Sequence, residues 1–356
     1  MGEKEVLGYD SSSKANARSR FRKLLSNVEM APGLALLVMC IVLSLTSPVF
    51  LTLFNLVTVA RQFSLLAIVA VGQTIAIISG EFDLSVGSVA GFCGLVFAIF
   101  VKEFGIPWWI AIAGGMGVGA LFGLVNAFVI TRLKVSSFIA TLGMMSIARS
   151  LTVAMTMGTP IIGFPKAFLN IGSGYIGRIP IPVILMLIII AVGYLFLRFT
   201  VLGRYIYATG GNVDAALISG VPTRRVKTFT LTVSGALAGL AGIVLVARLA
   251  SAEPMAGQGW ELESVAAVVI GGTSLFGGRG SMFGSFLGVA LMGILRNGLV
   301  LLGVRGEFVG VATGLVLILA VGVDQVRRRM AETIPLVENV KENSKQAKKA
   351  GDSKCQ

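Results

Sequence analysis

The chain has 356 residues; 55% of them are apolar and only 13% are charged. Soluble globular proteins carry about 25% charged residues, so this composition and the mean hydropathy of +0.88 exclude a soluble domain, a disordered chain and a coiled coil. No residue is a histidine, which removes the usual general base and metal ligand. We therefore predict an all-α, polytopic membrane protein, and the length leaves room for about ten transmembrane helices.

The net charge of +13 comes from 30 basic and 17 acidic residues. Membrane proteins concentrate Lys and Arg on their cytoplasmic loops, so we ascribe this excess to topology and predict no nucleic-acid partner. The cysteines are Cys40, Cys93 and Cys355, and no two of them have the CxxC spacing. Neither a disulfide framework nor a metal site is predicted.

The first 30 residues are polar and carry a basic cluster, and we interpret them as a cytoplasmic N-terminal segment. Residues 31–325 form the predicted membrane domain. Its apolar stretches are Ala31–Phe50, Phe63–Ser79, Leu84–Val101, Trp108–Ile130, Ser137–Met157, Ile181–Leu197, Thr228–Ala247, Ser264–Phe276, Met282–Leu302 and Phe308–Val323. Several are shorter than the roughly 20 residues that cross 30 Å of hydrocarbon. Short spans that glycine interrupts are either discontinuous helices that line a transport route or simply tilted helices.

The distribution of basic residues predicts the orientation of the chain. With the N-terminus in the cytoplasm, 22 of the 30 basic residues fall on cytoplasmic segments, the others being Arg61, Lys102, Arg149, Lys166, Arg178, Arg248, Arg296 and Arg305. The reverse topology would invert this bias, against the positive-inside rule. We predict that both termini are cytoplasmic and that residues 326–356 form a disordered, basic cytoplasmic tail.

The longest inner loop, residues 198–227, contains a predicted short helix of about seven residues. Asn212 is a good N-cap, Asp214 suits the positive end of the helix dipole, and Gly220 with the nearby Pro222 ends the helix. Ala215, Ala216 and Gly220 share one side by their spacing. Such a small-residue face either enters a groove on another protein or packs on its own bundle. The longest outer loop, residues 158–180, has no pattern of a folded domain.

Polar residues beside the predicted spans are candidates for lining a solute path. Asp83 lies close to Ser85 and Ser88 between two apolar runs. An acid near the membrane is costly and points to a functional site, unless it caps the following helix. Thr273 and Ser274 lie in a glycine-rich stretch, which allows either a broken helix or close helix packing.

Two arginines, Arg149 and Arg296, fall within predicted spans. Each would cost about 2.5–3.5 kcal/mol at the bilayer centre, so we expect both to reach the interface, a wet path or a partner subunit. We expect Arg149 to face the path. The complete set of path candidates is Gln73, Asp83, Ser85, Ser88, Thr141, Arg149, Thr273 and Ser274.

Four stretches of the chain are distinctive: EFDLSVGS (Glu81–Ser88), KVSSFIATLGMM (Lys134–Met145), GGNVDAALISGV (Gly210–Val221) and AAVVIGGTSLFGGRGS (Ala266–Ser281). Together they resemble the ribose-type monosaccharide permease family of ABC importers. They occur in that family's order, and the likeness covers roughly residues 31–325. Asp214 stands where the general E-A-A-x-x-x-G loop of ABC importer permeases has Glu, and Ser136 stands where the family has Pro.

The resemblance implies a type II-importer-like permease in a bacterial inner membrane. It implies a second permease copy or sister permease, a cytoplasmic ATPase subunit and a periplasmic or lipid-anchored sugar-binding protein as partners. By this analogy the residues that dock on the ATPase are Gly211, Asn212, Asp214, Ala215, Ala216 and Gly220. The sequence has no G-x-x-x-x-G-K-[ST] phosphate loop, so we expect ATP to be hydrolysed by the partner and no cofactor to bind this chain.

Other functions remain open on the sequence alone. The substrate could be a branched-chain amino acid or a nucleoside, which the wider superfamily also transports. An ion-coupled secondary transporter is disfavoured because proton relays usually need intramembrane Asp, Glu or His, and here His is absent and most acids lie at the edges of spans. A membrane enzyme is disfavoured because neither paired carboxylates nor a nucleophile with a base can be recognised.

Overall fold

A computed structural model describes residues 30–305 and, beyond them, positions 308, 310–312, 314, 315, 318, 319 and 322. Most of the predicted N-terminal segment, the predicted basic tail and much of the predicted last span therefore lie outside the described residues.

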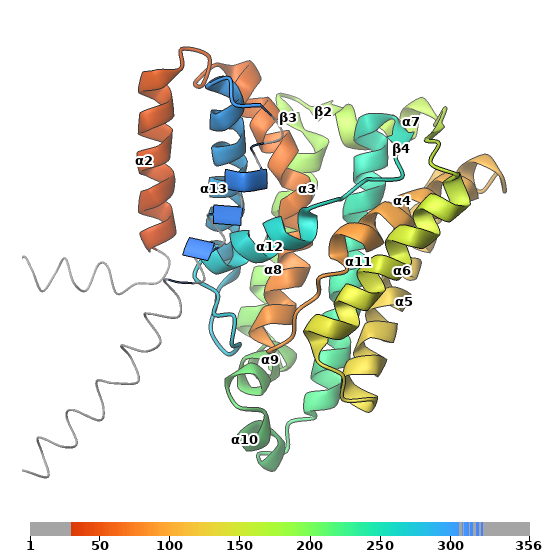
Figure 1. The fold of residues 1–356 in the computed structure, drawn as a ribbon, viewed down its shortest axis with the longest axis vertical. Helices are drawn as coiled ribbons and strands as arrows, with labels where there is room; N and C mark the ends of the chain where they lie inside the picture. The colour runs from red at the N-terminus through yellow and green to blue at the C-terminus, as the bar shows by residue number, and fades with distance from the viewer. Residues whose placement is uncertain are drawn as a thin grey trace, which may run out of the picture.

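The described part of the chain is built almost entirely from helices (Figure 1). They are α2 (Met30–Thr46), α3 (Leu53–Ile78), α4 (Val86–Lys102), α5 (Trp108–Arg132), α6 (Ser137–Thr156), α7 (Lys166–Ser173), α8 (Ile181–Phe199), α9 (Val201–Gly211), α10 (Val213–Ile218), α11 (Thr223–Leu249), α12 (Trp260–Ile270) and α13 (Met282–Leu301). Two small antiparallel ladders pair β1 (Ile161–Ile162) with β4 (Ser251–Ala252) and β2 (Tyr175–Ile176) with β3 (Ile179–Pro180). The prediction of an all-α polytopic membrane protein is confirmed.

Six of the described helices, α3, α5, α6, α8, α11 and α13, are long and apolar enough to cross a membrane. The predicted span Ser264–Phe276 contains α12, whose eleven residues extend about 16 Å at 1.5 Å per residue, roughly half of the hydrocarbon core. This helix ends six residues earlier than predicted. Gly271 follows its last residue, and Gly272 has a φ of +88°, which is incompatible with a right-handed helix.

Two other helices begin earlier than predicted, α2 ends at Thr46 rather than Phe50, and each long loop contains a helix that was not predicted, which in the inner loop is α9. Helix α3 begins at Leu53, ten residues early, because the Thr52 side chain caps it by accepting the Asn55 N–H. Helix α11 begins at Thr223 rather than Thr228. The outer loop, in which no folded domain was expected, contains the short helix α7, whose apolar side buries Phe168 against Phe97 and Phe164.

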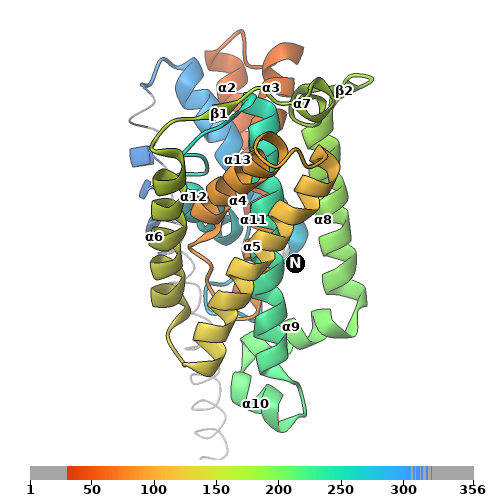
Figure 2. The same ribbon diagram turned by 90° about the vertical axis from the view of Figure 1, so that its right-hand side faces the viewer.

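Helices α3 and α11 form the centre of the bundle (Figures 1 and 2). In α3 and α11, more than half of the residues in the most apolar stretch of the helix are buried. In α5, α6 and α8, less than a third of them are buried. Helix α11 approaches α5 at backbone distance: a Cβ on Gly119 would collide with the carbonyl oxygen of Gly235, and one on Gly235 would collide with that of Gly119. Glycine thus permits the close contact on which this helix pair depends.

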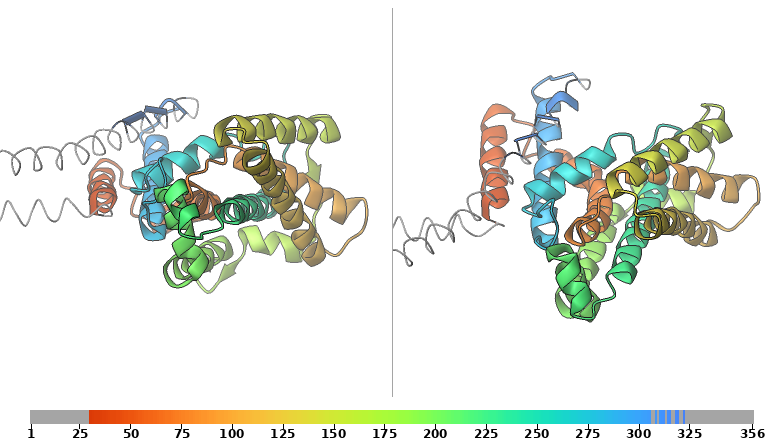
Figure 3. Two further views of the ribbon diagram at one scale, coloured as in Figure 1. Left: turned by 90° about the horizontal axis from the view of Figure 1, so that it is seen from below. Right: turned by 60° about the horizontal axis from the view of Figure 1, so that its bottom comes forward.

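The bundle has two distinct ends. Helices α9 and α10 lie at one end, which we call the α10 end, while α7 and its two ladders lie at the opposite α7 end (Figures 1 and 2). Viewed from the α10 end, α6 and α12 lie on one side of the bundle and α8 lies on the other (Figure 3).

Candidate functional site

Helix α10 is the shortest helix among the described residues, and its N-terminus is well defined. The Asn212 side chain accepts a hydrogen bond of 2.9 Å from the Ala215 N–H, which confirms the predicted N-cap. The helix has six residues, close to the seven expected. It stops where expected, because Gly220 has φ +83°, a conformation that favours glycine.

The exposed surface of α10 is more apolar than the sequence analysis expected. Of the predicted small-residue face, Ala216 is buried against the chain's own core, whereas Ala215 and Gly220 are exposed. The prominent exposed side chains are Leu217 and Ile218, which are 60% and 88% exposed. The sequence analysis missed these two residues. Two apolar side chains in a short loop helix that begins near the charged Asp214 could have indicated an exposed apolar surface.

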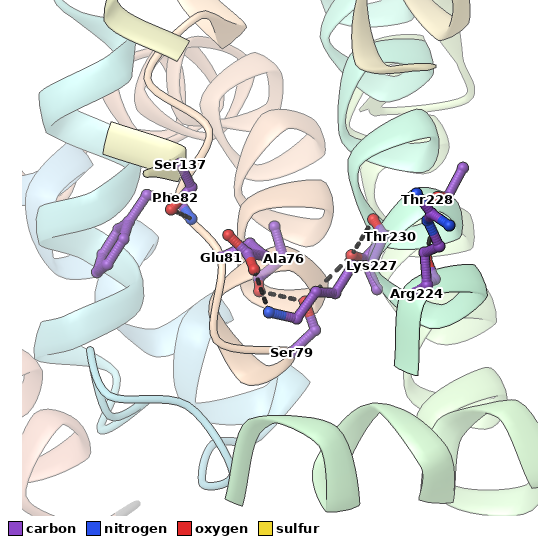
Figure 4. A network of polar contacts seen from close by, with 9 residues as sticks. All are labelled: Ala76, Ser79, Glu81, Phe82, Ser137, Arg224, Lys227, Thr228 and Thr230. Atoms are coloured by element: carbon purple, nitrogen blue, oxygen red, sulfur yellow. Dashed lines mark hydrogen bonds and ion pairs between the residues drawn. The ribbon is translucent and has the colours of Figure 1, made fainter. Parts of the chain in front are cut away.

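The segment between α3 and α4, residues 79–85, is held against α11 and α6 (Figure 4). We call it the α3–α4 linker. Lys227 on α11 forms an ion pair of 2.5 Å with the buried Glu81, and the Ser79 and Thr230 hydroxyls lie 3.1 Å apart. On the other side, Ser137 at the start of α6 accepts a hydrogen bond of 3.3 Å from the Phe82 N–H. The linker therefore moves only if α6 or α11 moves with it, or if these contacts break.

Four glycines join this linker to α9 and to the segment between α12 and α13. Gly80, Gly210, Gly277 and Gly278, which we call the glycine junction, meet through their backbones. The Gly278 N–H donates to the carbonyl oxygen of Ile78 at 2.9 Å. A Cβ on Gly210 would collide with that same oxygen. Close to the junction, Tyr207 on α9 donates to the carbonyl oxygen of Gly280 at 2.9 Å, so α9 is attached to two other segments.

Asp83 is buried and joins three segments of the chain. Its Oδ1 accepts hydrogen bonds from the Ser85 hydroxyl at 2.5 Å and the Ser85 N–H at 3.1 Å, and its Oδ2 accepts one from the Ser234 hydroxyl at 2.8 Å. Asn126 on α5 donates to the Ser85 hydroxyl at 3.0 Å. The alternative that Asp83 caps α4 is wrong, since no side chain caps that helix and Ser85 occupies its N-cap position.

Replacing Asp83 with Ala is expected to destabilise the chain by about 3 kcal/mol, because hydrogen bonds to charged groups contribute about 1.5–3 kcal/mol each and buried hydroxyls would lose their acceptor. The measurement is the thermal unfolding midpoint in detergent, with Asp214→Ala as the matched control. Asp214 is exposed, so its removal should change stability by no more than about 0.5 kcal/mol. Equal unfolding midpoints for the two variants would contradict this role of Asp83.

The remaining path candidates other than Arg149 are buried or partly buried within the chain. Gln73, Ser88, Thr141 and Thr273 are at most 2% exposed. Neither amide atom of Gln73 has a hydrogen-bond partner among the described residues. Thr273 belongs to a short chain of hydroxyls, in which Ser285 lies 3.4 Å from Thr273 and accepts from Thr74 at 2.8 Å. Ser274 is partly buried, and its hydroxyl accepts from the Phe276 N–H.

Arg149 is half-buried on α6, and its guanidinium contacts the segment that precedes α12. Its Nη1 donates to the carbonyl oxygens of Pro254 at 3.2 Å and Ala256 at 2.9 Å. Arg296 has a different environment: its side chain is 56% exposed and pairs with Glu263 on α12 at 3.3 Å. Both arginines thus connect their helices to α12 or to the segment before it.

These features define a helical membrane protein with broken elements, an exposed short helix at one end and buried polar joints between segments. The family described as branched-chain amino acid transport system / permease component matches residues 55–321. The chain belongs to this family of transport-system permeases. No solved structure matches the sequence significantly.

Several individual relatives are sugar permeases by name. The chain is 42% identical over 305 residues to the ribose import permease protein of Escherichia coli K12, covering 85% of this chain and 95% of that protein. It is 40% identical over 299 residues to the ribose import permease protein of Bacillus subtilis, covering 83% and 92%. It is 35% identical over 283 residues to the D-allose transport system permease protein of E. coli K12, covering 80% and 87%.

Proposed function

We propose that the chain is the transmembrane permease subunit of an ATP-driven, binding-protein-dependent importer for a monosaccharide of the ribose type. The observation that carries this proposal is the likeness to the ribose permeases over more than four fifths of the chain, at about 40% identity. The wider family's description names branched-chain amino acids, so an amino-acid substrate is the second candidate.

The α10 end is the cytoplasmic side in this proposal, and an ATPase subunit docks on α10. Support comes from the two exposed apolar side chains, Leu217 and Ile218, on a short, well-capped helix. Docking here would transmit force because α9, which leads into α10, is attached through the glycine junction to α3 and to the segment before α13. Five of the predicted docking residues are exposed at this end: Gly211, Asn212, Asp214, Ala215 and Gly220. The sixth, Ala216, is buried between α10 and the rest of the chain.

The chain itself moves the solute by alternating access between the two sides of an inner membrane. The α7 end faces outward and receives the sugar from a periplasmic or lipid-anchored binding protein, and the two termini are cytoplasmic. A second permease, identical or a sister chain, completes the path. We assign ATP hydrolysis to the partner, and the predicted path residues act here by joining the segments that have to move, as Asp83 joins the α3–α4 linker to α11.

The test is uptake by the complex that the chain forms. The full chain is purified from its own cells with associated proteins, which mass spectrometry identifies, and the complex is reconstituted in vesicles with ATP inside and the binding protein outside. We expect labelled ribose to accumulate only when both ATP and the binding protein are present. Accumulation without ATP would overturn the ATP-driven scheme, and uptake of leucine in place of ribose would favour the second candidate.

A further inference from the structure

A cavity of about 260 Å³ lies between α3, α11, α12 and α13. It is nearer the α7 end than the α10 end, because Arg248 belongs to the last turn of α11 and Arg296 to the last two turns of α13. Both helices run from the α10 end toward the α7 end (Figures 1 and 2). The side chains that matter for recognition are Gln62, Arg248, Trp260, Glu263 and Arg296.

The cavity opens on a face that cannot be in contact with lipid tails. Two guanidinium groups, a carboxylate and a carboxamide line it, and ionised groups in hydrocarbon are strongly disfavoured. Arg296 is more than half exposed although it lies on an apolar helix. Gln62 is also exposed. This face of the bundle is therefore wet, as the wall of a solute path must be.

The polar groups are arranged to bind hydroxyls. Arg296 is already paired with Glu263 at 3.3 Å, so the carboxylate is oriented and still has oxygen lone pairs to accept from a ligand. Arg248 has no hydrogen-bond or ion-pair partner among the described residues, and the charged groups that act on it are the cations Arg61 and Arg296, so its planar fork of donors is available. Gln62 adds one more donor and one more acceptor.

An aromatic ring provides the apolar part of the site. Trp260 begins α12 and lines the cavity together with apolar residues of α3, α11 and α13. A monosaccharide ring has C–H groups on its faces and hydroxyls around its rim, so it suits an indole ring beside planar polar side chains. The volume is just below the range of about 300–1,000 Å³ that is usual for ligand pockets, which suits a small ligand such as one monosaccharide.

We propose that this cavity is a binding station in which a neutral monosaccharide pauses on its way through the permease, held by Arg248, Glu263 and Gln62 against Trp260. The inference rests on the proposed function.

The first experiment measures binding to the full chain in lipid nanodiscs by tryptophan fluorescence. The chain has three tryptophans, so Trp260→Phe should remove the ribose-induced change, while Trp109→Phe at the start of α5 should retain it. Arg248→Gln should weaken ribose binding about tenfold, which corresponds to about 1.4 kcal/mol. Arg248→Lys, which keeps the charge, should bind better than Arg248→Gln.

The matched control is Arg61→Gln, which removes a nearby cation that stacks on Tyr175 and does not line the cavity. It should bind ribose like the wild type, and all variants should unfold at similar temperatures. Equal ribose affinity in the Arg248→Gln and wild-type chains would overturn the proposal, as would leucine binding in place of ribose.

The second experiment separates this inference from the proposed function. In the reconstituted complex, Arg248→Gln should raise the ribose concentration for half-maximal uptake about tenfold, whereas the control Arg61→Gln should leave it unchanged. If the variant transports ribose like the wild type, the cavity is not a station although the importer assignment stands. If the wild-type complex takes up no ribose, the importer assignment itself falls.

Discussion

Replacing both Leu217 and Ile218 with Asp is expected to abolish ATP-dependent uptake while the permease stays folded. The two side chains are the most exposed apolar groups of α10, and they contribute little to the chain's own core. Apolar anchors in a protein interface commonly contribute about 2 kcal/mol or more each, so losing two should weaken ATPase docking by roughly a thousandfold. The measurements are copurification of the ATPase subunit and ribose uptake by the reconstituted complex.

The control for this variant is Leu133→Asp. Leu133 follows α5 at the same end of the bundle and is 61% exposed, so its substitution adds the same type of charge away from α10. Copurification and uptake should be near the wild-type level in this control. If the Leu217 and Ile218 double variant still retains its ATPase and transports ribose, α10 is not the docking element. Thermal unfolding of each purified permease verifies that folding is unchanged.

Gly210→Ala is expected to destabilise the α10 end and to remove most uptake, whereas Gly211→Ala should leave the stability of the chain unchanged. A methyl group on Gly210 would collide with the carbonyl oxygen of Ile78 and would press on the Gly278 N–H, which is hydrogen-bonded to that same oxygen. Nothing lies within 4 Å of the corresponding position on Gly211, although both glycines are in the last turn of α9. The two substitutions are chemically identical, so any difference between the two variants reports the different surroundings of Gly210 and Gly211.

The expected cost of Gly210→Ala is about 1–3 kcal/mol, the usual range for overpacking a tight contact. The observable is the unfolding midpoint of the purified chain together with the rate of ribose uptake. Alanine favours a helix over glycine, so Gly211→Ala should be neutral or slightly stabilising. Equal unfolding midpoints for Gly210→Ala and Gly211→Ala would contradict the tight contact at the glycine junction.

The polytopic helical class and nearly all of the described helices could be predicted from the sequence. Apolar runs bounded by Pro, Gly and charged residues locate helices because a chain in lipid has to satisfy its backbone hydrogen bonds locally. The cap of α10 was predictable for a similar reason: Asn212 bonds to a backbone group three residues away, at Ala215. Helix α7 was not predicted from the local sequence pattern, because it depends on the stacking of Phe168 with Phe97, which lies far away in the sequence on α4.

The roles of the polar residues depended on tertiary structure. Asp83 was recognised as unusual from the sequence, but its partner Ser234 is 151 positions away, so its burial and its bonds were invisible. The cavity near Arg248 draws its lining from four helices, and the sequence pattern marked only Arg296 among its polar residues as out of place.

Taken by itself, the sequence determined that this chain is a helical membrane protein, where most of its helices lie, and which motifs relate it to sugar permeases. Those properties depend on hydropathy and on hydrogen bonds between near neighbours. Only the tertiary structure decided that Leu217 and Ile218 are exposed while Ala216 is buried, and that Glu263 meets Arg296. Such properties depend on how helices distant in the chain cross one another, and glycine contacts such as that of Gly119 with Gly235 set those crossings.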